Sequence, residues 1–438
     1  MKIELRFKYF FFFVISSLFF FESNLYSLEP NEIKTDKGIK FWFVEDNSIP
    51  IISVNFSFSG GAFFDEDGKE GTSSFIASLL DEGAGNLSSI QFQNTMDEIG
   101  MKLSFSSSRD SFQGSFQIIS ENKEQGFKLL KSVLTNPLLD DKDIEKIRNQ
   151  ILSGLKLKEI DVNNLASKEF HQVFFSSHSF GRNVEGTVLS INNISKNDLR
   201  NYIKKFLSIS NLVVGVSGNV KSNEIKNLID DAFGHFVLKN QNLPVIPTKN
   251  NFPSGIQIEK KNFSQAAVLF GHKGLKRNDK NFFAARIVNY VLGGGGFQSR
   301  MYKNVREKRG LVYSIYSYLV PYKNNDILLG GFQTKNETVY EAISLVKDEW
   351  EKISSVGITQ KEFEEAKTYY KGSFSRNLTS TSSISSLLKV VQEYGLPKSY
   401  FKNRNKIIDS LTLKEVNIVA KNLFKKEDLF FTIVGNVN

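Results

Sequence analysis

Two stretches of 27 residues with a similar pattern indicate the fold of this chain. The first copy, at 194–220, reads ISKNDLRNYIKKFLSISNLVVGVSGNV, and the second, at 411–437, reads LTLKEVNIVAKNLFKKEDLFFTIVGNV. The two copies align without a gap at a constant offset of 217 positions. Each begins with a residue suited to a helix N-cap, Ser195 or Thr412, continues with helical apolar spacing, and ends in a β-branched and aromatic strand. A match of this length indicates an internal duplication.

The segments upstream of each copy repeat one order of elements. Apolar and alternating stretches predict strands at 40–60 and at 256–271. Helical spacing predicts helices at 124–134, 141–160, 279–292, 339–356 and 359–370. The fold class is therefore α+β, with two homologous halves of about 200 residues each. The join is predicted at 238–255, where three of the eight prolines occur, which leaves domains at 28–237 and 256–438.

The N-terminus has the organisation of a secretory signal peptide. Three basic residues in the first eight positions precede an apolar run at 9–21, and polar residues then lead to Ser27. The run is too short to cross a hydrocarbon core of roughly 30 Å as a helix. We therefore expect a signal peptide at 1–27 and export to the periplasm. The alternative is an uncleaved membrane anchor, because a bulky leucine, Leu25, lies two positions before Ser27.

The composition excludes several classes of site. The chain has no cysteine, which excludes disulfides, thiolate metal sites and a cysteine nucleophile. Its net charge of +9 is spread along the sequence without arginine-rich or aromatic and basic clusters, which argues against nucleic-acid binding. The four histidines are scattered without an i,i+4 pair, and we interpret them as satisfied structural or surface residues: His171, His178, His235 and His272.

The segment at 293–319, GGGGFQSRMYKNVREKRGLVYSIYSYL, carries the candidate chemistry. Its glycines, Gly293, Gly294, Gly295 and Gly296, predict a flexible loop or a close backbone approach to a ligand. A helix is predicted at 297–308, Gly310 suits the position after its end, and a strand is predicted at 311–319. Arg306 and Tyr313 can then point to one place, although residues of these types at such positions are most often structural.

The sequence VREKRGLVYS after a glycine run resembles the arginine and tyrosine motif of the insulinase/pitrilysin metallopeptidases and of mitochondrial processing peptidase. The duplication and the stretch SFGRNVEGTVLSINNIS at 179–195 are similar to the same family. The resemblance implies two α/β-sandwich halves, each an antiparallel-rich sheet with helices on one face. It also implies that Arg306 and Tyr313 hold the scissile peptide opposite a zinc ion. From the close backbone approach that glycines allow, we expect the glycine run at 293–296 to bind substrate.

The zinc-binding half of the family motif is missing from the equivalent stretch at 68–86. The family has a His-x-x-Glu-His helix there, and this chain has Ser74, Ala77 and Ser78 at the three positions. Ser153 and Gly154 stand near the expected third ligand, a glutamate. Serine hydroxyls are not zinc ligands of this class, so we expect no metal in this chain. Two neighbouring carboxylates, Asp81 and Glu82, form either an acidic pair or a solvated helix end, and the second is favoured.

These observations leave two hypotheses in different classes. The first is a subunit without zinc that contributes Arg306 and Tyr313 to a heterodimer, in which a partner with His-x-x-Glu-His holds the zinc and an unfolded peptide is the substrate. The second is a catalytically inactive structural or peptide-binding scaffold of the same family. A peptidase active alone lacks its metal ligands. A serine hydrolase lacks its Gly-x-Ser-x-Gly elbow, and a phosphate site lacks the Gly-Lys-Ser/Thr that follows the glycines in a P-loop.

Overall fold

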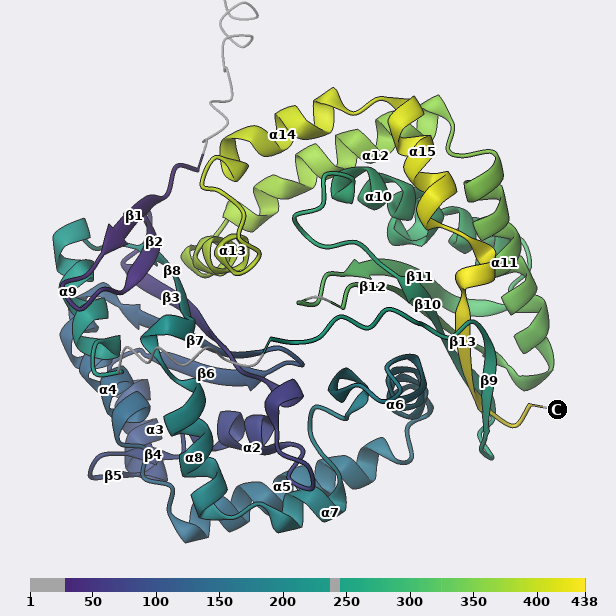
Figure 1. The fold of residues 1–438 in the computed structure, drawn as a ribbon. Coiled ribbons are helices and arrows are strands. Elements are labelled where there is room, and N and C mark those ends of the chain that lie inside the picture. Colours follow the sequence, from purple (N-terminus) through teal and green to yellow (C-terminus); the bar gives the residue numbers. More distant parts are fainter. Residues whose placement is uncertain (1–27, 237–244, 324, 438) are drawn as a thin grey trace, which may run out of the picture.

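The computed structural model describes residues 28–236, 245–323 and 325–437. The signal peptide predicted at 1–27 and part of the join predicted at 238–255 lie outside these residues. None of the helices in the described ranges is long and apolar enough to cross a membrane. The described chain forms two halves, each built on its own sheet, which face one another across the molecule (Figure 1).

The two sheets share one strand order, which confirms the duplication. The N-terminal sheet has the order β1 (Asn31–Lys34), β2 (Lys40–Glu45), β8 (Leu212–Gly218), β3 (Ile51–Ser59), β7 (Ser111–Ile119) and β6 (Lys102–Ser107). The C-terminal sheet has the order β11 (Val312–Val320), β12 (Ile327–Lys335), β10 (Gln265–Lys273), β13 (Phe430–Gly435) and β9 (Gly255–Lys260). The order β2-β8-β3-β7-β6 in the first sheet corresponds to the order β9-β13-β10-β12-β11 in the second, and β1 is an additional edge strand of the first sheet. In each sheet one pair is parallel, β2 with β8 and β9 with β13, and the other pairs are antiparallel.

The repeated stretch folds as its spacing predicts. Ser195 and Thr412 each cap a helix, and each forms a capping box with the acidic residue three positions on, Asp198 or Glu415. The two helices are α8 (Lys196–Phe206) and α15 (Leu413–Leu423), and they keep the offset of 217 positions. In each copy, a short 3-10 turn then leads from the helix into a buried strand, β8 or β13.

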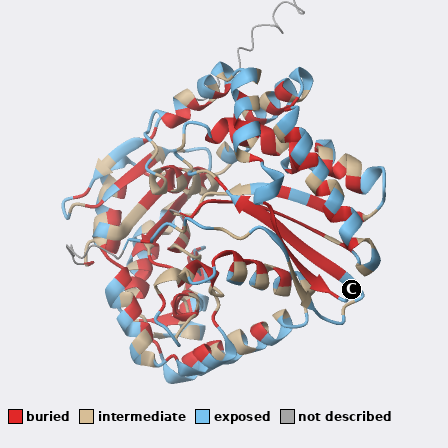
Figure 2. Cartoon of the chain, turned by 45° about the vertical axis from the view of Figure 1, so that its right-hand side comes forward, coloured by how far each residue is buried: buried red, intermediate tan, exposed pale blue. Residues whose placement is uncertain are grey.

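Most helices cover the outer face of the sheet in their own half. In the N-terminal half these are α2 (Thr72–Leu79), α3 (Ser89–Glu98), α4 (Lys123–Thr135), α5 (Asp141–Lys158), α7 (Val188–Asn193), α8 and α9 (Ser222–Phe233), with the small hairpin β4 (Gly83–Ala84) and β5 (Leu87–Ser88). In the C-terminal half they are α10 (Phe282–Asn289), α11 (Val339–Ser355), α12 (Gln360–Ser373), α14 (Tyr400–Ser410) and α15. The central strands are buried along most of their length (Figure 2).

The inner face of each sheet is covered by a helix from the other half, which adds to the predicted arrangement of helices on one face. Helix α6 (Val162–Phe174) places Phe170 and Phe174 against Leu269 and Phe430 of the C-terminal sheet. Helix α13 (Thr381–Glu393) lies on β3 and β8 of the N-terminal sheet. The two halves therefore exchange one helix each.

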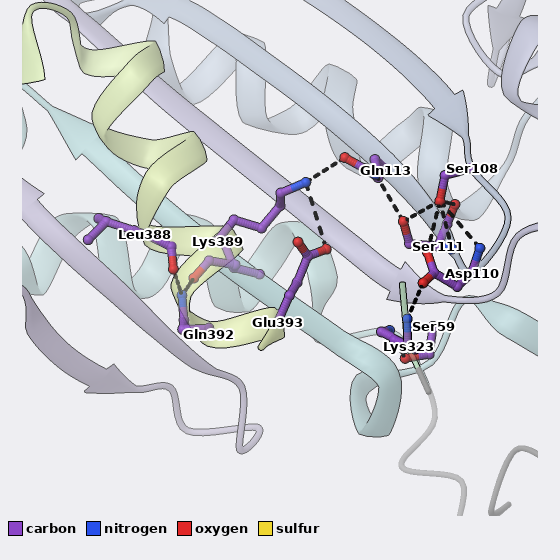
Figure 3. A network of polar contacts seen from close by, with 11 residues as sticks. Ser59, Ser108, Asp110, Ser111, Gln113, Lys323, Leu388, Lys389, Gln392 and Glu393 are labelled. Atoms are coloured by element: carbon purple, nitrogen blue, oxygen red, sulfur yellow. Dashed lines mark hydrogen bonds and ion pairs between the residues drawn. The ribbon is translucent and has the colours of Figure 1, made fainter. Parts of the chain in front are cut away.

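The contact of α13 is polar, whereas that of α6 is apolar. Ser53 Oγ lies 2.8 Å from Thr381 Oγ1, and Asn55 Nδ2 donates to Ser385 Oγ at 2.7 Å. Lys389, which is 5% exposed, donates from Nζ to Gln113 Oε1. Figure 3 shows this lysine and a second link between the halves, in which the Lys323 backbone N–H donates to Asp110. Because buried polar groups need partners, these bonds fix how the halves are placed.

Candidate functional site

Arg306 lies on a short helical turn that is fixed by its buried side. The π-helical turn η7 (Tyr302–Glu307) buries Tyr302 and Val305 against the core of the C-terminal half. Gly310, at φ +64°, has the left-handed conformation that favours glycine, and its N–H donates to the Arg306 carbonyl at 2.9 Å. This confirms the predicted helix end and places the arginine directly before the edge strand β11.

Tyr313 lies in a β-bulge at the start of that edge strand. The flanking pairs are Val312 with Thr334 and Ile315 with Phe332, so β11 has one more residue than β12 between them. A bulge leaves the extra residue out of the ladder and redirects its side chain. Tyr313 is accordingly 88% exposed, and no spacing in the sequence signals this bulge.

Arg306 and Tyr313 are both accessible and are not held by other groups. The Arg306 side chain is exposed, and its guanidinium carbon lies 5.2 Å from the centre of the Tyr302 ring. Within the described residues, neither the Arg306 side chain nor the Tyr313 hydroxyl makes a hydrogen bond or ion pair. Their convergence on one point remains a prediction.

The two arginines nearest to Arg306 in the sequence, Arg300 and Arg309, differ from it because each has a carboxylate partner. Arg300 forms a bidentate ion pair with Glu362 at 2.7 and 2.6 Å and also donates to the Gly357 carbonyl at 3.1 Å. Arg309, which is exposed, pairs with Glu341 at 3.2 Å. Of these three arginines, only Arg306 has no anionic partner in the described part of the chain.

The glycine run is helical rather than a single flexible loop. The π-helical turn η5 (Tyr290–Gly294) includes Gly293, which is buried, so the loop prediction is wrong there. A Cβ on Gly293 would lie 2.4 Å from Ser317 Oγ, which shows that glycine is needed to pack this turn against β11. Gly294, Gly295 and Gly296 are at least partly exposed, and a role for the run in substrate binding stays a prediction.

The positions equivalent to the family's metal ligands do not fit zinc. Helix α2 presents Ser74 half-buried, Ala77 buried and Ser78 exposed, and the Ser78 hydroxyl donates to the Ser74 carbonyl at 3.2 Å. On α5, Ser153 is exposed, and a Cβ on Gly154 would have open space around it. No group of three histidine, aspartate or glutamate residues that could hold a metal occurs in the described ranges. The donor set lacks the imidazoles and carboxylate that a zinc peptidase needs.

The neighbouring carboxylates have a structural role that the sequence did not show. Glu82 accepts hydrogen bonds from Lys146 of α5 and from Ser89 of α3. Asp81 is partly buried, and this burial raises the pKa of its carboxyl group. Glu82 is therefore not simply part of a solvated helix end, because it links the turn after α2 to the helices α3 and α5.

The four histidines are scattered, as predicted, but three of them are not fully satisfied. His171 and His272 are buried, and each Nδ1 lies 2.8 Å from a backbone carbonyl oxygen. Their Nε2 atoms and both ring nitrogens of His235 have no hydrogen-bond partner among the described residues. His178 alone uses both nitrogens, with the Phe180 N–H and the Pro247 carbonyl. Sequence spacing cannot reveal such unpartnered atoms.

Ser217, in the sequence Gly215-Val216-Ser217-Gly218, is buried within β8. It therefore lies in a strand and not on an exposed turn between a strand and a helix. This placement agrees with the rejection of a serine hydrolase.

Comparison with protein families gives two adjacent matches. The model described as insulinase, peptidase family M16, matches residues 42–188. The model described as the peptidase M16 inactive domain matches residues 193–370. Together they span most of both halves.

Curated relatives and solved structures agree with these matches. A protein of Helicobacter pylori named "Non-peptidase homolog YmxG" is 28% identical over 400 residues, which cover 90% of this chain and 91% of the relative. A Bacillus subtilis protein named "Uncharacterized zinc protease YmxG" is 25% identical, covering 89% and 94%. The crystal structure of a peptidase M16 inactive domain from Pseudomonas fluorescens has a TM-score of 0.89 at 24% identity, covering 94% of this chain and 98% of that one. This last similarity concerns the fold.

Proposed function

The chain belongs to the insulinase family, peptidase family M16, and we propose that it is the subunit without zinc of a two-subunit metallopeptidase of that family. It is a member of the inactive type, since it matches the inactive-domain model and is similar to a protein named a non-peptidase homolog. In our proposal it supplies Arg306 and Tyr313, whereas a partner with a His-x-x-Glu-His helix supplies the zinc ion. The substrate is an unfolded peptide held between the two subunits.

The observation that carries this proposal is that the side chains of Arg306 and Tyr313 are exposed and make no hydrogen bond or ion pair to the described residues. Arg300 and Arg309, on the same short segment, are held by carboxylates. Arg306 contacts only an aromatic ring among the polar and ring interactions of the described residues, and Tyr313 is exposed at a bulge. Both are therefore able to act on a bound molecule.

The chemistry of these two groups suits a peptide carbonyl that gains negative charge. A phenol O–H donates one hydrogen bond, and a guanidinium donates several from a planar fork. Donors that are already in place where the charge develops lower the barrier by about 2.7–4 kcal/mol each in comparable oxyanion sites. Arg306 is also able to hold the substrate backbone before reaction, because a guanidinium can form paired hydrogen bonds to a peptide.

A second candidate, a catalytically inactive scaffold or peptide-binding protein, is favoured by one specific observation. The H. pylori relative, which is similar over nine-tenths of both chains, is named a non-peptidase homolog. In this alternative Arg306 and Tyr313 bind peptide, or nothing, without contributing to turnover.

We also propose that the protein is exported to the periplasm. This rests on the basic, apolar and polar order of residues 1–27. Cell fractionation of the full chain, with mass measurement of the mature N-terminus, distinguishes a cleaved signal from an anchor that would keep the protein at the membrane.

Kinetics of a reconstituted pair test the proposal. The full chain is co-purified with an insulinase-type subunit of the same organism that contains His-x-x-Glu-His, and a 1:1 heterodimer is expected. Tyr313→Phe should lower kcat by roughly 10²-fold, the scale for loss of one transition-state donor. Arg306→Ala should lower kcat and raise KM. Arg309→Ala is the matched control, since it removes an exposed arginine nearby, and should leave both constants unchanged.

Three outcomes would contradict the proposal. Wild-type rates in both the Tyr313→Phe and Arg306→Ala pairs would favour the scaffold. A chain that stays monomeric beside every such subunit would exclude the heterodimer. Retention of about one zinc per chain by the purified protein after dialysis would mean that a metal site exists despite Ser74, Ala77 and Ser78.

A further inference from the structure

A cavity of about 430 Å³ in the N-terminal half is lined by neither Arg306 nor Tyr313. It is bounded by the end of α5, by α6 and by the segment at 181–189. Its volume falls within the range of about 300–1,000 Å³ that is usual for ligand sites. The charged side chains in its wall are four cations and one carboxylate: Arg109, Lys158, Lys168, Arg182 and Glu159.

Two of the four cations have their own anionic partners, and two do not. Lys158 pairs with Glu185, and Arg182 pairs with Asp67. Arg109 donates to the backbone carbonyls of Phe180 and Arg182, which are uncharged. Neither Arg109 nor Lys168 forms an ion pair within the described ranges. Against these two cations the wall has one carboxylate, Glu159, so its net charge is positive, which favours an anionic ligand.

His171 lies in the same wall, but its free acceptor is not presented to the cavity. Its ring lines the cavity and is 6% exposed. Its Nδ1 lies 2.8 Å from the Ser167 carbonyl oxygen, which can only accept, so Nδ1 carries the proton and Nε2 has a free lone pair. Nε2 is buried and has no partner among the described residues. Because Nε2 is itself buried, a molecule in the cavity does not reach it, and the cations remain the groups that can recognise a ligand.

The remaining wall is mixed: it includes polar side chains such as Asn164 and Thr187, and leucines that can take an apolar side chain. Leu155 and Leu165 line the cavity from α5 and α6, and Leu189 lies at its edge with 74% of its surface exposed. We propose that this cavity binds the C-terminal residue of a peptide. The terminal carboxylate contacts Lys168 and Arg109, and an apolar terminal side chain packs on the leucines. This inference goes beyond the proposed function, because it needs neither a partner subunit nor turnover.

Peptide binding by the purified full chain tests the proposal. The probe is a fluorescein-labelled tetrapeptide that ends in leucine, prepared with a free carboxylate and with an amidated end, and binding is measured by fluorescence anisotropy. The amide should bind at least about tenfold more weakly, because it lacks the charge that the cations recognise. Lys168→Gln should weaken binding of the free acid by about threefold to fivefold and leave the amide unaffected. Lys156→Gln, an exposed lysine on α5 outside the cavity wall, is the matched control.

Equal affinity for acid and amide, or no binding of either, would overturn the proposal. Full displacement of the peptide by an equal concentration of inorganic phosphate would also overturn it, because the cavity would then be a general anion site.

Discussion

Gly215 of β8 offers a direct test of how the two halves are held together. A Cβ at this position would lie 2.2 Å from the Ser385 carbonyl oxygen and 2.6 Å from the Lys389 backbone nitrogen, both in α13. Both are backbone atoms, so no rotation of a side chain relieves the clash. Gly215→Ala therefore forces α13 away from the N-terminal sheet and stretches the hydrogen bonds of Ser53 and Asn55 to that helix.

The expected loss of stability follows from these contacts. Overpacking of a tight site costs about 1–3 kcal/mol, and each weakened hydrogen bond adds up to about 1 kcal/mol. Replacing glycine within a strand returns about 0.5–1 kcal/mol of backbone entropy. The free energy of unfolding should thus fall by about 3 kcal/mol. For halves of this size, that corresponds to a Tm lower by roughly 6–12 °C.

Differential scanning calorimetry of Gly215→Ala beside Gly154→Ala gives the measurement and its control. Gly154 lies within α5, and a Cβ there has nothing within 4 Å, so its replacement should stabilise the protein by about 0.5–1 kcal/mol. A Tm of Gly215→Ala equal to or above that of the wild type would refute the docking of α13 on this sheet.

Three further predictions concern stability. Burial, and then the nearby positive charge of an arginine, lower the pKa of His171 to about 3, below an unfolded value of about 6.5. The folded state requires neutral His171, so the stability that depends on it is present above pH 6.5 and is lost as the pH falls toward 3. In urea titrations, the free energy of unfolding should fall by about 2 kcal/mol between pH 7 and pH 5. His171→Phe should remove most of this pH dependence. Arg300→Ala should lower the free energy of unfolding by about 2 kcal/mol in the same assay, because it removes a bidentate and partly buried ion pair, whereas Arg309→Ala should change it by less than about 1 kcal/mol. Ser195→Ala and Thr412→Ala remove equivalent capping boxes and should each cost about 1 kcal/mol in denaturant titrations; a large difference between them would contradict their equivalence.

The sequence predicts the elements of this fold well, because most of its signals are local. The cap residues Ser195 and Thr412, the apolar spacing of α8 and α15 and the strands after them can all be read within windows of ten to twenty residues. The exchange of α6 and α13 cannot be read in that way. An amphipathic pattern shows that a helix has an apolar face but does not show which sheet covers it.

The same limit explains the differences at the candidate site. Gly293 is buried because Ser317, 24 positions later, lies against it, and only the folded structure brings the two together. The bulge at Tyr313 depends on the register between β11 and β12. The unpartnered nitrogens of His171 and His235 depend on what surrounds each ring in space.

The exposure of Tyr313 bears on why the chain retains this motif. A phenol that is 88% exposed and makes no hydrogen bond to the described residues contributes little to the free energy of unfolding. The bulge that presents it interrupts the ladder between β11 and β12, so it adds no stability either. Arg300, by contrast, is fixed by three hydrogen bonds, and these contacts within the chain account for its placement. Stability therefore explains Arg300, whereas it gives no reason for the placement of the Tyr313 hydroxyl. In our proposal Arg306 and Tyr313 act on a molecule outside the chain, and a second subunit supplies the zinc because α2 offers no metal ligands at Ser74, Ala77 and Ser78.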